Sequence, residues 1–485
     1  MTQFDKRNLS MMMDFYEMTM SYGYFRQTHG DVRVAFDLFF RSVPDRGGYA
    51  VFAGLEHVIE FVENLSFSDE DIDYFRAQNL FSEEFLSFLR GFRFRGDIYA
   101  VPEGTIIYPN EPLMTIVAPI IDAQLIETAI LAQINHQSLI ATKASRIVRA
   151  AEGRKVSDFG ARRAHNMDAA TYGARAAYIG GVDMTATVSA GQQFGIPISG
   201  TMAHSWIMFF EDEFASFKKY AELYPQATVL LVDTYDVIHS GIPNAIRTAH
   251  EVLAPRGHRL AGVRIDSGDL AYLSKRVRTM LDDAGLTDCK IILSNSLDEF
   301  TISSLLLQGA QVDSFGVGER LITAKSDPVF GAVYKLVAVE KDGVFLPRIK
   351  MSENVEKLTN PGIKDLYRIY DRHGKAVADM LALQGEEIDL TKPFRYVDPR
   401  KPWKNRFFEG FSAVNLRRLY VRSGKRVEQL PTLEEIRCYV QKQLAEEIWP
   451  EEQRIENPHQ HYLDMTPMYY EVKMGLLDDM RGKHS

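Results

Sequence analysis

The sequence has only two cysteines, Cys289 and Cys438, so neither a disulfide framework nor a cysteine-based zinc site is expected. It lacks any apolar run long enough to cross a membrane, and its first ten residues, MTQFDKRNLS, contain no apolar signal core. Positive charge is not in excess: the formal net charge is −9, which excludes a general nucleic-acid-binding surface. These absences predict a soluble protein of a reducing compartment, the cytoplasm.

What is present is an ordinary globular composition, 46% hydrophobic and 25% charged, with enough residues for more than one domain. The middle third repeats one sequence pattern, in which a short apolar or β-branched run is followed by a small polar residue and then by a helical pattern. Several runs are spaced by about the length of one βα unit. The runs lie at residues 155–160, 181–191, 196–201, 229–236, 261–270, 290–296, 312–319 and 334–339.

About eight such runs predict a parallel β/α barrel, irregular because the spacing around residues 182–198 is too short for a full helix. An open doubly wound sheet is the alternative. The flanking segments mix strand and helix patterns, and we expect them to form one split, β-rich domain. The predicted domains are an N-terminal α+β domain with a linking helix (1–140), the catalytic α/β barrel (141–340), and a segment that completes the split domain and adds a helical tail (341–485).

Local patterns give more specific expectations. A long linking helix is predicted from Asp122, as N-cap, to Gly153, and a helix over 270–285 is predicted to begin at an Asp269 N-cap. Further helical patterns cover 52–65, 69–90 and 433–449, and hairpin turns are expected at 341–343 and 373–374.

Polar side chains collect where the predicted barrel strands end, and barrel enzymes work at the carboxyl ends of their strands. These side chains are Asp233, Asp236, Asp266, Ser267, Asp269, Ser294 and Asn295. For each one alone, the alternative is an N-cap on the following helix, and that reading is strong for Asp269 and Ser296. Clustered carboxylates at one rim suit Mg²⁺ or ribose hydroxyls.

A basic segment, SDFGARRAHN, follows one strand end directly and contains Arg162 and Arg163. Residues 140–180 hold eight Lys and Arg against three acidic residues, in a chain that is acidic overall. Such a local surplus favours an anionic small ligand, because arginine pairs with phosphate or carboxylate through two hydrogen bonds. A solvated helix face is the alternative for Arg146, Arg149 and Arg154.

Two further features have competing interpretations. Gly316 and Gly318 follow a predicted strand, where Gly-x-Gly lets backbone N–H groups approach an anion, although an ordinary tight turn is the alternative. His204, beside Ser205, is expected at a strand end as a nucleophile or proton carrier, or else as a buried imidazole with satisfied hydrogen bonds. The Met- and aromatic-rich stretch 11–25 indicates a core or dimer-contact helix.

Taken in order along the chain, these motifs resemble nicotinate phosphoribosyltransferase. The matching segments are DFYEMTM, PEGTIIYPNEPL, SDFGARRAH, GTMAHSW, LLVDTYD, VRIDSGDL, and VGERLIT followed by VYKLV. The resemblance implies a type II phosphoribosyltransferase fold, which is an irregular α/β barrel with a split N-terminal domain, usually in dimers with sites at the interface. It also implies conversion of nicotinate and phosphoribosyl pyrophosphate to nicotinate mononucleotide and pyrophosphate, in NAD salvage, coupled to ATP hydrolysis through a phosphohistidine.

The resemblance also implies residue roles. His204 would be the phosphorylated histidine. The pyridine ring would stack on Phe159 and on Tyr16, the latter from the partner subunit. Arg162 or Arg163 would bind the substrate carboxylate or a phosphate.

Other roles in the resembled family fall on the strand ends. Three carboxylates would serve Mg²⁺, the ribose or the orientation of the histidine: Asp233, Asp236 and Asp266, with Asp266 the expected metal ligand. Arg264, Gly316 and Gly318 would face phosphate. The remaining residues expected to bind substrate are Thr201, Ser205 and Ser294.

The sequence departs from some relatives where Glu319 and Arg320 follow the Gly-x-Gly, which leaves the detail of that phosphate loop open. Nicotinamide- and quinolinate-using phosphoribosyltransferases are the alternatives within the superfamily, but the cationic pair of ARRAH suits a carboxylate better than an amide. A type I phosphoribosyltransferase fits LLVDTYD poorly, because its acidic residues are three apart. A nucleotide-sensing barrel without turnover is the non-enzymatic alternative.

Overall fold

The structure is a computed structural model that describes residues 8–28, 30–350, 358–389, 391–397 and 405–484. The chain divides into two compact units: unit 1 is Met1–Leu139 with Val329–Ser485, and unit 2 is Ile140–Pro328. No helix in the described ranges is long and apolar enough to span a membrane. The first seven residues, which belong to the stretch searched for a signal core, lie outside the described part.

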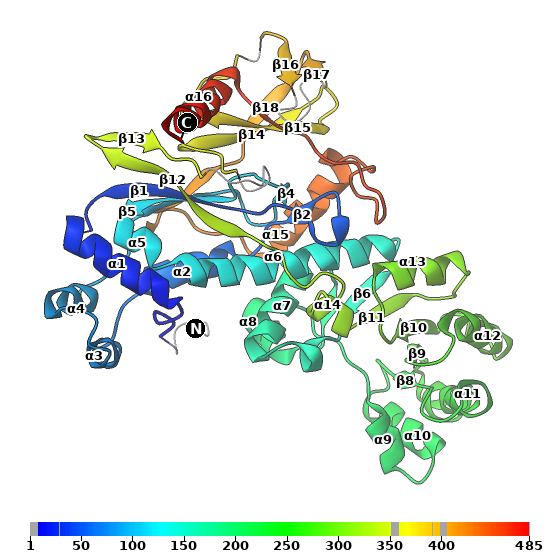
Figure 1. Ribbon diagram of the computed structural model, residues 1–485. Helices are drawn as coiled ribbons and strands as arrows, with labels where there is room; N and C mark the ends of the chain where they lie inside the picture. Colours follow the sequence, from blue (N-terminus) through cyan, green and yellow to red (C-terminus); the bar gives the residue numbers. More distant parts are fainter. Residues whose placement is uncertain (1–7, 29, 351–357, 390, 398–404, 485) are drawn as a thin grey trace. The chain divides into compact units, whose positions relative to one another are not determined.

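Unit 2 is built on a six-stranded parallel sheet with strand order β7-β6-β11-β10-β9-β8. Its strands are β6 (Lys155–Asp158), β7 (Met184–Thr185), β8 (Val229–Leu231), β9 (Gly262–Ile265), β10 (Lys290–Ser294) and β11 (Ser314–Val317). Figure 1 shows β6, β11, β10, β9 and β8 in succession, with helices α11, α12 and α13 beside them. The curled parallel sheet confirms the predicted irregular α/β barrel, which is realised as a half-barrel.

Two of the eight expected runs are not strands of this sheet. Residues 196–201 contribute only a single bridge, between Ile198 and Thr185, because Pro197 cannot donate a ladder hydrogen bond. Residues 334–339 belong to β12 (Val333–Lys341), an antiparallel strand of unit 1 that pairs with β1 (Arg33–Phe39). The prediction of both segments as barrel strands is therefore wrong.

The helices of unit 2 follow the strands. They are α7 (Met167–Ile179), α8 (Val188–Phe194), α9 (His204–Phe209), α10 (Glu213–Leu223), α11 (Ile242–Thr248), α12 (Leu270–Asp283), α13 (Glu299–Leu307) and α14 (Glu319–Ile322). Shorter helical turns are η3 (Ala161–Arg163), η4 (Val237–Gly241), η5 (Ala249–Leu253) and η6 (Ala254–Arg256).

Capping residues explain where two of these helices begin. The Asp269 carboxylate accepts from the Tyr272 N–H (3.0 Å), which confirms it as the cap of α12. Asp298, not Ser296, caps α13, because its carboxylate accepts from the Thr301 N–H at 2.8 Å. Asp122 is not a cap either: it lies inside α5 (Ile120–Gln124) and accepts from Arg95. The linking helix itself is α6 (Glu127–Ala150).

Within its described residues, unit 1 contains two larger sheets and two small ones. The seven-stranded sheet has order β13-β12-β1-β5-β3-β19-β20, and the four-stranded sheet has order β18-β14-β15-β21. Their remaining strands are β3 (Asp97–Ala100), β5 (Met114–Pro119), β13 (Val344–Pro347), β14 (Lys364–Tyr370), β15 (Ala376–Leu383), β18 (Ser412–Asn415), β19 (Arg418–Arg422), β20 (Lys425–Arg426) and β21 (Leu463–Met465). Two-stranded sheets join β2 (Ala50–Val51) with β4 (Ile106–Ile107), and β16 (Phe394–Val397) with β17 (Asn405–Phe408).

The predicted hairpins and most predicted helices of unit 1 are confirmed. β12 pairs with β13 across the turn at 341–343, and β14 pairs with β15 across the turn at 373–374. The helices are α1 (Phe15–Thr28), η2 (Pro44–Arg46), α2 (Leu55–Asn64), α3 (Asp69–Ala77), α4 (Glu83–Arg90), α15 (Leu433–Lys442), η8 (Gln443–Glu447) and α16 (Pro467–His484).

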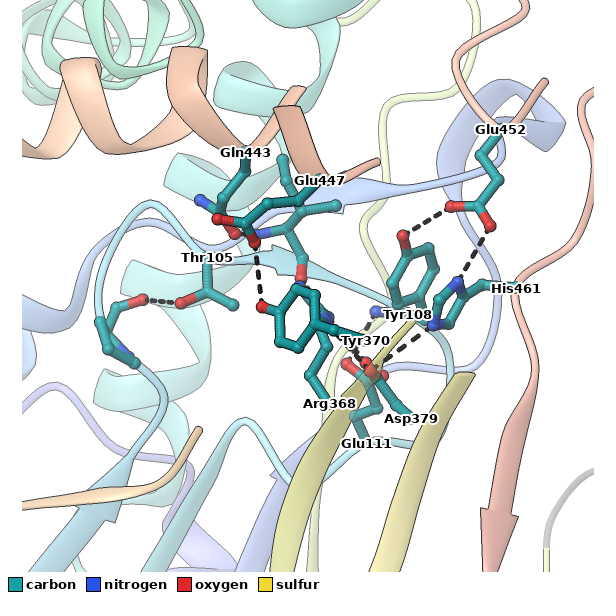
Figure 2. A network of polar contacts seen from close by, with 12 residues as sticks. Thr105, Tyr108, Glu111, Arg368, Tyr370, Asp379, Gln443, Glu447, Glu452 and His461 are labelled. Carbon is teal, nitrogen blue, oxygen red and sulfur yellow. Dashed lines mark hydrogen bonds and ion pairs between the residues drawn. The ribbon is translucent and has the colours of Figure 1, made fainter. Parts of the chain in front are cut away.

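A core charge cluster inside unit 1 joins strands β14 and β15 to the segment before β21. We define it as Tyr108, Glu111, Arg368, Asp379, Glu452 and His461 (Figure 2). The Arg368 guanidinium donates to both oxygens of Asp379 at 2.9 and 2.6 Å, and to the Ile106 carbonyl at 2.8 Å. Arg368 and Asp379 are each fully buried.

The His461 imidazole occupies the other side of the cluster. Its ring stacks on the Tyr108 ring, with 3.8 Å between centroids, and its Nδ1 lies 3.0 Å from Glu452 Oε1. Its Nε2 lies 3.5 Å from Asp379 Oδ1. Burial lowers the pKa of His461, but Asp379 and Glu452 outweigh burial and raise that pKa above the usual value. Burial raises the pKa of Glu111 well above its ordinary range, whereas the Arg368 guanidinium overcomes burial and lowers the pKa of Asp379.

This arrangement makes the stability of unit 1 depend on pH. Because the folded state raises the pKa of His461, its contribution is complete below the unfolded value of about 6.5 and is lost as pH rises through the folded value. We expect the free energy of unfolding to fall over that window in urea titrations. His461→Gln should remove this part of the pH dependence, and an unchanged profile in that variant would contradict the assignment.

Candidate active site

The site begins with a histidine and a carboxylate from neighbouring segments of unit 2. His204 Nε2 lies 3.3 Å from Asp233 Oδ1. The His204 side chain is 41% exposed, whereas that of Asp233 is 1% exposed. His204 is the first residue of α9 rather than the end of a strand, because residues 199–203 form an irregular loop after the bridge at Ile198. The imidazole therefore reaches solvent while one of its nitrogens is held by a buried acid.

Asp233 also connects the ends of two adjacent strands. It follows β8, and its Oδ2 accepts from the Asp266 N–H (3.1 Å) and from the Ser267 hydroxyl (2.6 Å), both just after β9. A carboxylate that accepts several hydrogen bonds from fixed donors is held in one orientation. Asp233 therefore determines how the His204 ring is placed.

Arg264 is the centre of the next group of contacts. Its Nε donates to Ser294 Oγ (3.0 Å) and its Nη1 to Thr201 Oγ1 (3.1 Å), while its Nη2 lies 3.5 Å from Asp266 Oδ1. The Ser294 hydroxyl donates in turn to Asp266 Oδ1. Ser294 thus bridges the guanidinium and the carboxylate, and all four side chains are fixed together.

An aromatic ring completes the site. The Arg264 guanidinium carbon lies 5.5 Å from the centroid of the Phe159 ring, within the range of a cation–π contact. The Phe159 N–H donates to the Val317 carbonyl at 2.7 Å, which attaches the turn after β6 to β11. Gly316 of β11 lies directly against the ring. The site residues therefore come from the carboxyl ends of five adjacent strands, β8, β9, β10, β11 and β6.

The structure adds a buried pair that we did not select from sequence. Asp158, the last residue of β6, is fully buried and accepts from the Gly160 N–H and the Thr185 hydroxyl, both at 2.8 Å. Burial raises the pKa of Asp158, and these two donors oppose the rise. The pair fixes the turn that carries Phe159. An acid at the end of a strand, in SDFG, was the available sequence signal.

Other predicted residues lie outside this set of contacts. Arg162 and Arg163 are exposed on η3, and Arg163 Nε lies 4.0 Å from Glu319. Asp236 caps η4 by accepting from the Ile238 and His239 N–H groups, and its bonds to His239 lower its pKa.

Three predicted positions remain. Ser205 follows His204 on α9, and Gly318 precedes α14. Tyr16 lies on α1 of unit 1, where its pKa is raised by burial and by nearby carboxylates, Glu127 first. The roles predicted for these three residues, for Asp236, for both arginines and for the residues of the contact network stay predictions.

The predicted Mg²⁺ site can be compared with the carboxylate oxygens that the site offers as ligands. Within the described residues no group of three or more His, Cys, Asp or Glu side chains could enclose a metal ion. Asp266 Oδ1 is engaged by Ser294 and Arg264, and its Oδ2 accepts no hydrogen bond from the residues described. Mg²⁺ commonly uses one or two carboxylates together with substrate phosphates and water. One free carboxylate oxygen therefore fits a substrate-borne Mg²⁺ but not a closed protein cage.

A half-barrel whose strand ends carry a histidine–aspartate pair, an arginine and a half-buried aromatic ring is typical of an α/β enzyme with an anionic substrate. Models of the nicotinate phosphoribosyltransferase (NAPRTase) N-terminal domain, family and C-terminal domain match residues 11–135, 154–356 and 363–473. The chain belongs to the nicotinate phosphoribosyltransferase family.

Individual relatives agree along nearly the full length. Nicotinate phosphoribosyltransferase of Bacillus subtilis is 44% identical over 483 residues, which cover 99% of this chain and 97% of the relative. That of Caenorhabditis elegans is 34% identical, with 95% and 92% covered. The crystal structure of human nicotinic acid phosphoribosyltransferase superposes with a TM-score of 0.85 at 28% identity, covering 96% of this chain and all of that one. These matches confirm the predicted family and fold class.

Proposed function

We propose that this protein transfers the phosphoribosyl group of phosphoribosyl pyrophosphate to nicotinate, forming nicotinate mononucleotide and pyrophosphate for NAD salvage. One observation carries the proposal: hydrogen bonds run without interruption from His204 through Asp233, Asp266 and Ser294 to Arg264 beside the Phe159 ring. This network supports the proposal because it brings an imidazole, two carboxylates, a guanidinium and an aromatic ring together at one edge of one sheet.

The chemistry of the transfer explains these residue types. Departure of pyrophosphate leaves positive charge on the ribose and negative charge on the leaving group. Arg264, held by Thr201 and Ser294, would face a phosphate. Positioning of the two substrates supplies most of the rate enhancement, because the protein forms no covalent bond to the sugar in this step. The nicotinate ring would stack on Phe159.

ATP would act through His204. Its Nε2 proton is donated to Asp233 Oδ1, which leaves the lone pair of Nδ1 to attack the γ-phosphorus while ADP departs. Asp233 stabilises the positive charge of the phosphorylated imidazole. Asp266 Oδ2 would hold Mg²⁺ together with oxygens of phosphoribosyl pyrophosphate, and the ion would neutralise the leaving pyrophosphate.

Assembly into a homodimer is part of the proposal. Several large apolar side chains of unit 2 are exposed to water, which is unfavourable in a monomer. Their exposed fractions are 86% for Met167, 81% for Phe209, 68% for Val188 and 66% for Met208. In this proposal a second subunit covers them, and Tyr16 of a partner subunit stacks on the open side of the nicotinate. Both cysteines are free thiols, which supports the predicted cytoplasmic location.

Product analysis with three competing pyridines tests the function. Purified protein would be incubated with phosphoribosyl pyrophosphate, Mg²⁺ and equal amounts of nicotinate, nicotinamide and quinolinate, with and without ATP. We expect nicotinate mononucleotide to dominate and ATP to raise its yield. Preference for another pyridine would overturn the substrate, and tight nucleotide binding without pyrophosphate release would favour a sensor.

The basic turn η3 gives a separate prediction. Changing both Arg162 and Arg163 to Ala should raise KM for nicotinate or for phosphoribosyl pyrophosphate about tenfold or more, because charge-assisted hydrogen bonds to an anion are lost. Arg259→Ala is the matched control, since Arg259 is another exposed arginine of unit 2 and pairs with Asp288. Unchanged KM values for both substrates in the double variant would refute a binding role for the pair.

A further inference from the structure

Gly316 occupies a position where any side chain would collide with the Phe159 ring. A Cβ atom built on Gly316 would lie 2.4 Å from Phe159 Cε2 and 2.6 Å from Cδ2. The same atom would lie 3.3 Å from the Cβ of Ser294, which is the register partner of Gly316 on β10. The space is therefore closed on both sides. The φ angle of Gly316 is outside the left-handed region, so its backbone would accept an ordinary residue and only the space requires glycine.

Neither neighbour can move away freely. The Phe159 N–H is bonded to Val317 (2.7 Å) on the strand that carries Gly316, so the phenylalanine backbone cannot retreat. Ser294 is held on the other side by its bonds to Arg264 and Asp266. A methyl group at position 316 would therefore be accommodated by rotation of the Phe159 ring, while the Arg264 guanidinium stays held by Ser294 and Thr201.

We infer that Gly316 is a positioning residue that acts through Phe159. Because glycine has no side chain, the Phe159 ring can lie in the orientation in which the pyridine stacks on it. This assignment rests on the proposed function, and it differs from the role that the sequence predicts for Gly316, which is close approach of backbone to phosphate. Stacked aromatic pairs depend on ring offset and tilt, so a rotated ring binds a flat heterocycle more weakly. The effect should fall on nicotinate and not on the phosphorylated substrates.

A double-mutant cycle between Gly316→Ala and Phe159→Ala tests the inference. In the native background, Gly316→Ala should raise KM for nicotinate about tenfold, with KM for phosphoribosyl pyrophosphate and for ATP unchanged. In the Phe159→Ala background, adding Gly316→Ala should change KM for nicotinate less than twofold, since no ring remains to be displaced. Equal effects in the two backgrounds, or a change in KM for phosphoribosyl pyrophosphate alone, would overturn the inference and leave the proposed function intact.

Two further readouts cover the remaining outcomes. If Gly316→Ala alone fails to fold, the double variant should still fold and match Phe159→Ala in KM, and failure of the double variant to fold would overturn the inference. A crystal structure of Gly316→Ala should show a rotated Phe159 ring, and an unmoved ring would also overturn it. If Phe159→Ala by itself leaves KM for nicotinate unchanged, the proposed stacking surface is refuted together with this inference.

Discussion

Replacing Arg368 with methionine will lower the free energy of unfolding of unit 1 by about 3–5 kcal/mol. The substitution removes two hydrogen bonds to Asp379 and leaves that carboxylate fully buried without its guanidinium. Glu111 and His461 lie beside Asp379 but cannot replace both bonds. Urea unfolding curves should show the loss, and amide hydrogen exchange should rise first in β14 and β15.

Arg76→Met is the matched control for that experiment. Arg76 also pairs with a carboxylate, that of Glu83, but the Arg76 side chain is partly exposed and that of Glu83 well exposed, so solvent replaces the pair readily. Its unfolding midpoint should stay within error of the unchanged protein. Equal midpoints for the two variants would show that the core charge cluster contributes no more than a surface ion pair.

Replacing His204 with alanine will make turnover with ATP equal to turnover without ATP. The reason is that His204 is the only described side chain that combines an accessible imidazole nitrogen with a bond to the buried Asp233. The measurement is nicotinate mononucleotide formation with and without ATP, combined with incorporation of ³²P from γ-labelled ATP. The fold should be unchanged, because the imidazole is partly exposed and a smaller side chain leaves no closed cavity.

A second histidine variant is the control for that experiment. His250 is an exposed histidine of the same unit, and His250→Ala should retain both ATP stimulation and stoichiometric labelling. Stoichiometric ³²P labelling of His204→Ala would refute the assignment of the phosphorylated residue. Loss of labelling in both variants would indicate damage that is not specific to the site.

The sequence could predict much of the site because parallel strands deliver their carboxyl ends to one edge whatever their order in the sheet. Asp233, Asp266, Ser294 and Phe159 each follow or end a strand, so their convergence required only correct strands. His204 was placed at the correct edge by motif, although the segment before it is a loop and not a strand.

Features that depend on spatial neighbours could not be predicted. The pattern of β12 is that of any buried strand, and only its antiparallel pairing with β1 assigns it to the other unit. The choice of Asp298 over Ser296 as a helix cap depends on where the turn after β10 ends. The contact between Gly316 and the Phe159 ring joins positions far apart in the chain, and the glycine alone is consistent with a phosphate loop.

The core charge cluster also could not be predicted from the sequence. It combines Tyr108 and Glu111 with Arg368, Asp379 and His461, and no local pattern connects segments so distant. Each of these residue types is also common at protein surfaces, so none of them alone predicts a buried cluster. Only the packing of β14 and β15 shows that they are buried together.

The split layout of unit 1 has a consequence for biosynthesis. Strands β1, β5 and β3 are made early, yet one edge of this ribbon pairs with β12 and the other with β19. Because β1 ends at Phe39 and β12 begins at Val333, translation at about 5–20 residues per second leaves β1 without its partner for roughly 15–60 s. The emerging chain therefore presents two bare strand edges outside the ribosome, and elongation rate and chaperone supply will govern how much of the enzyme escapes aggregation.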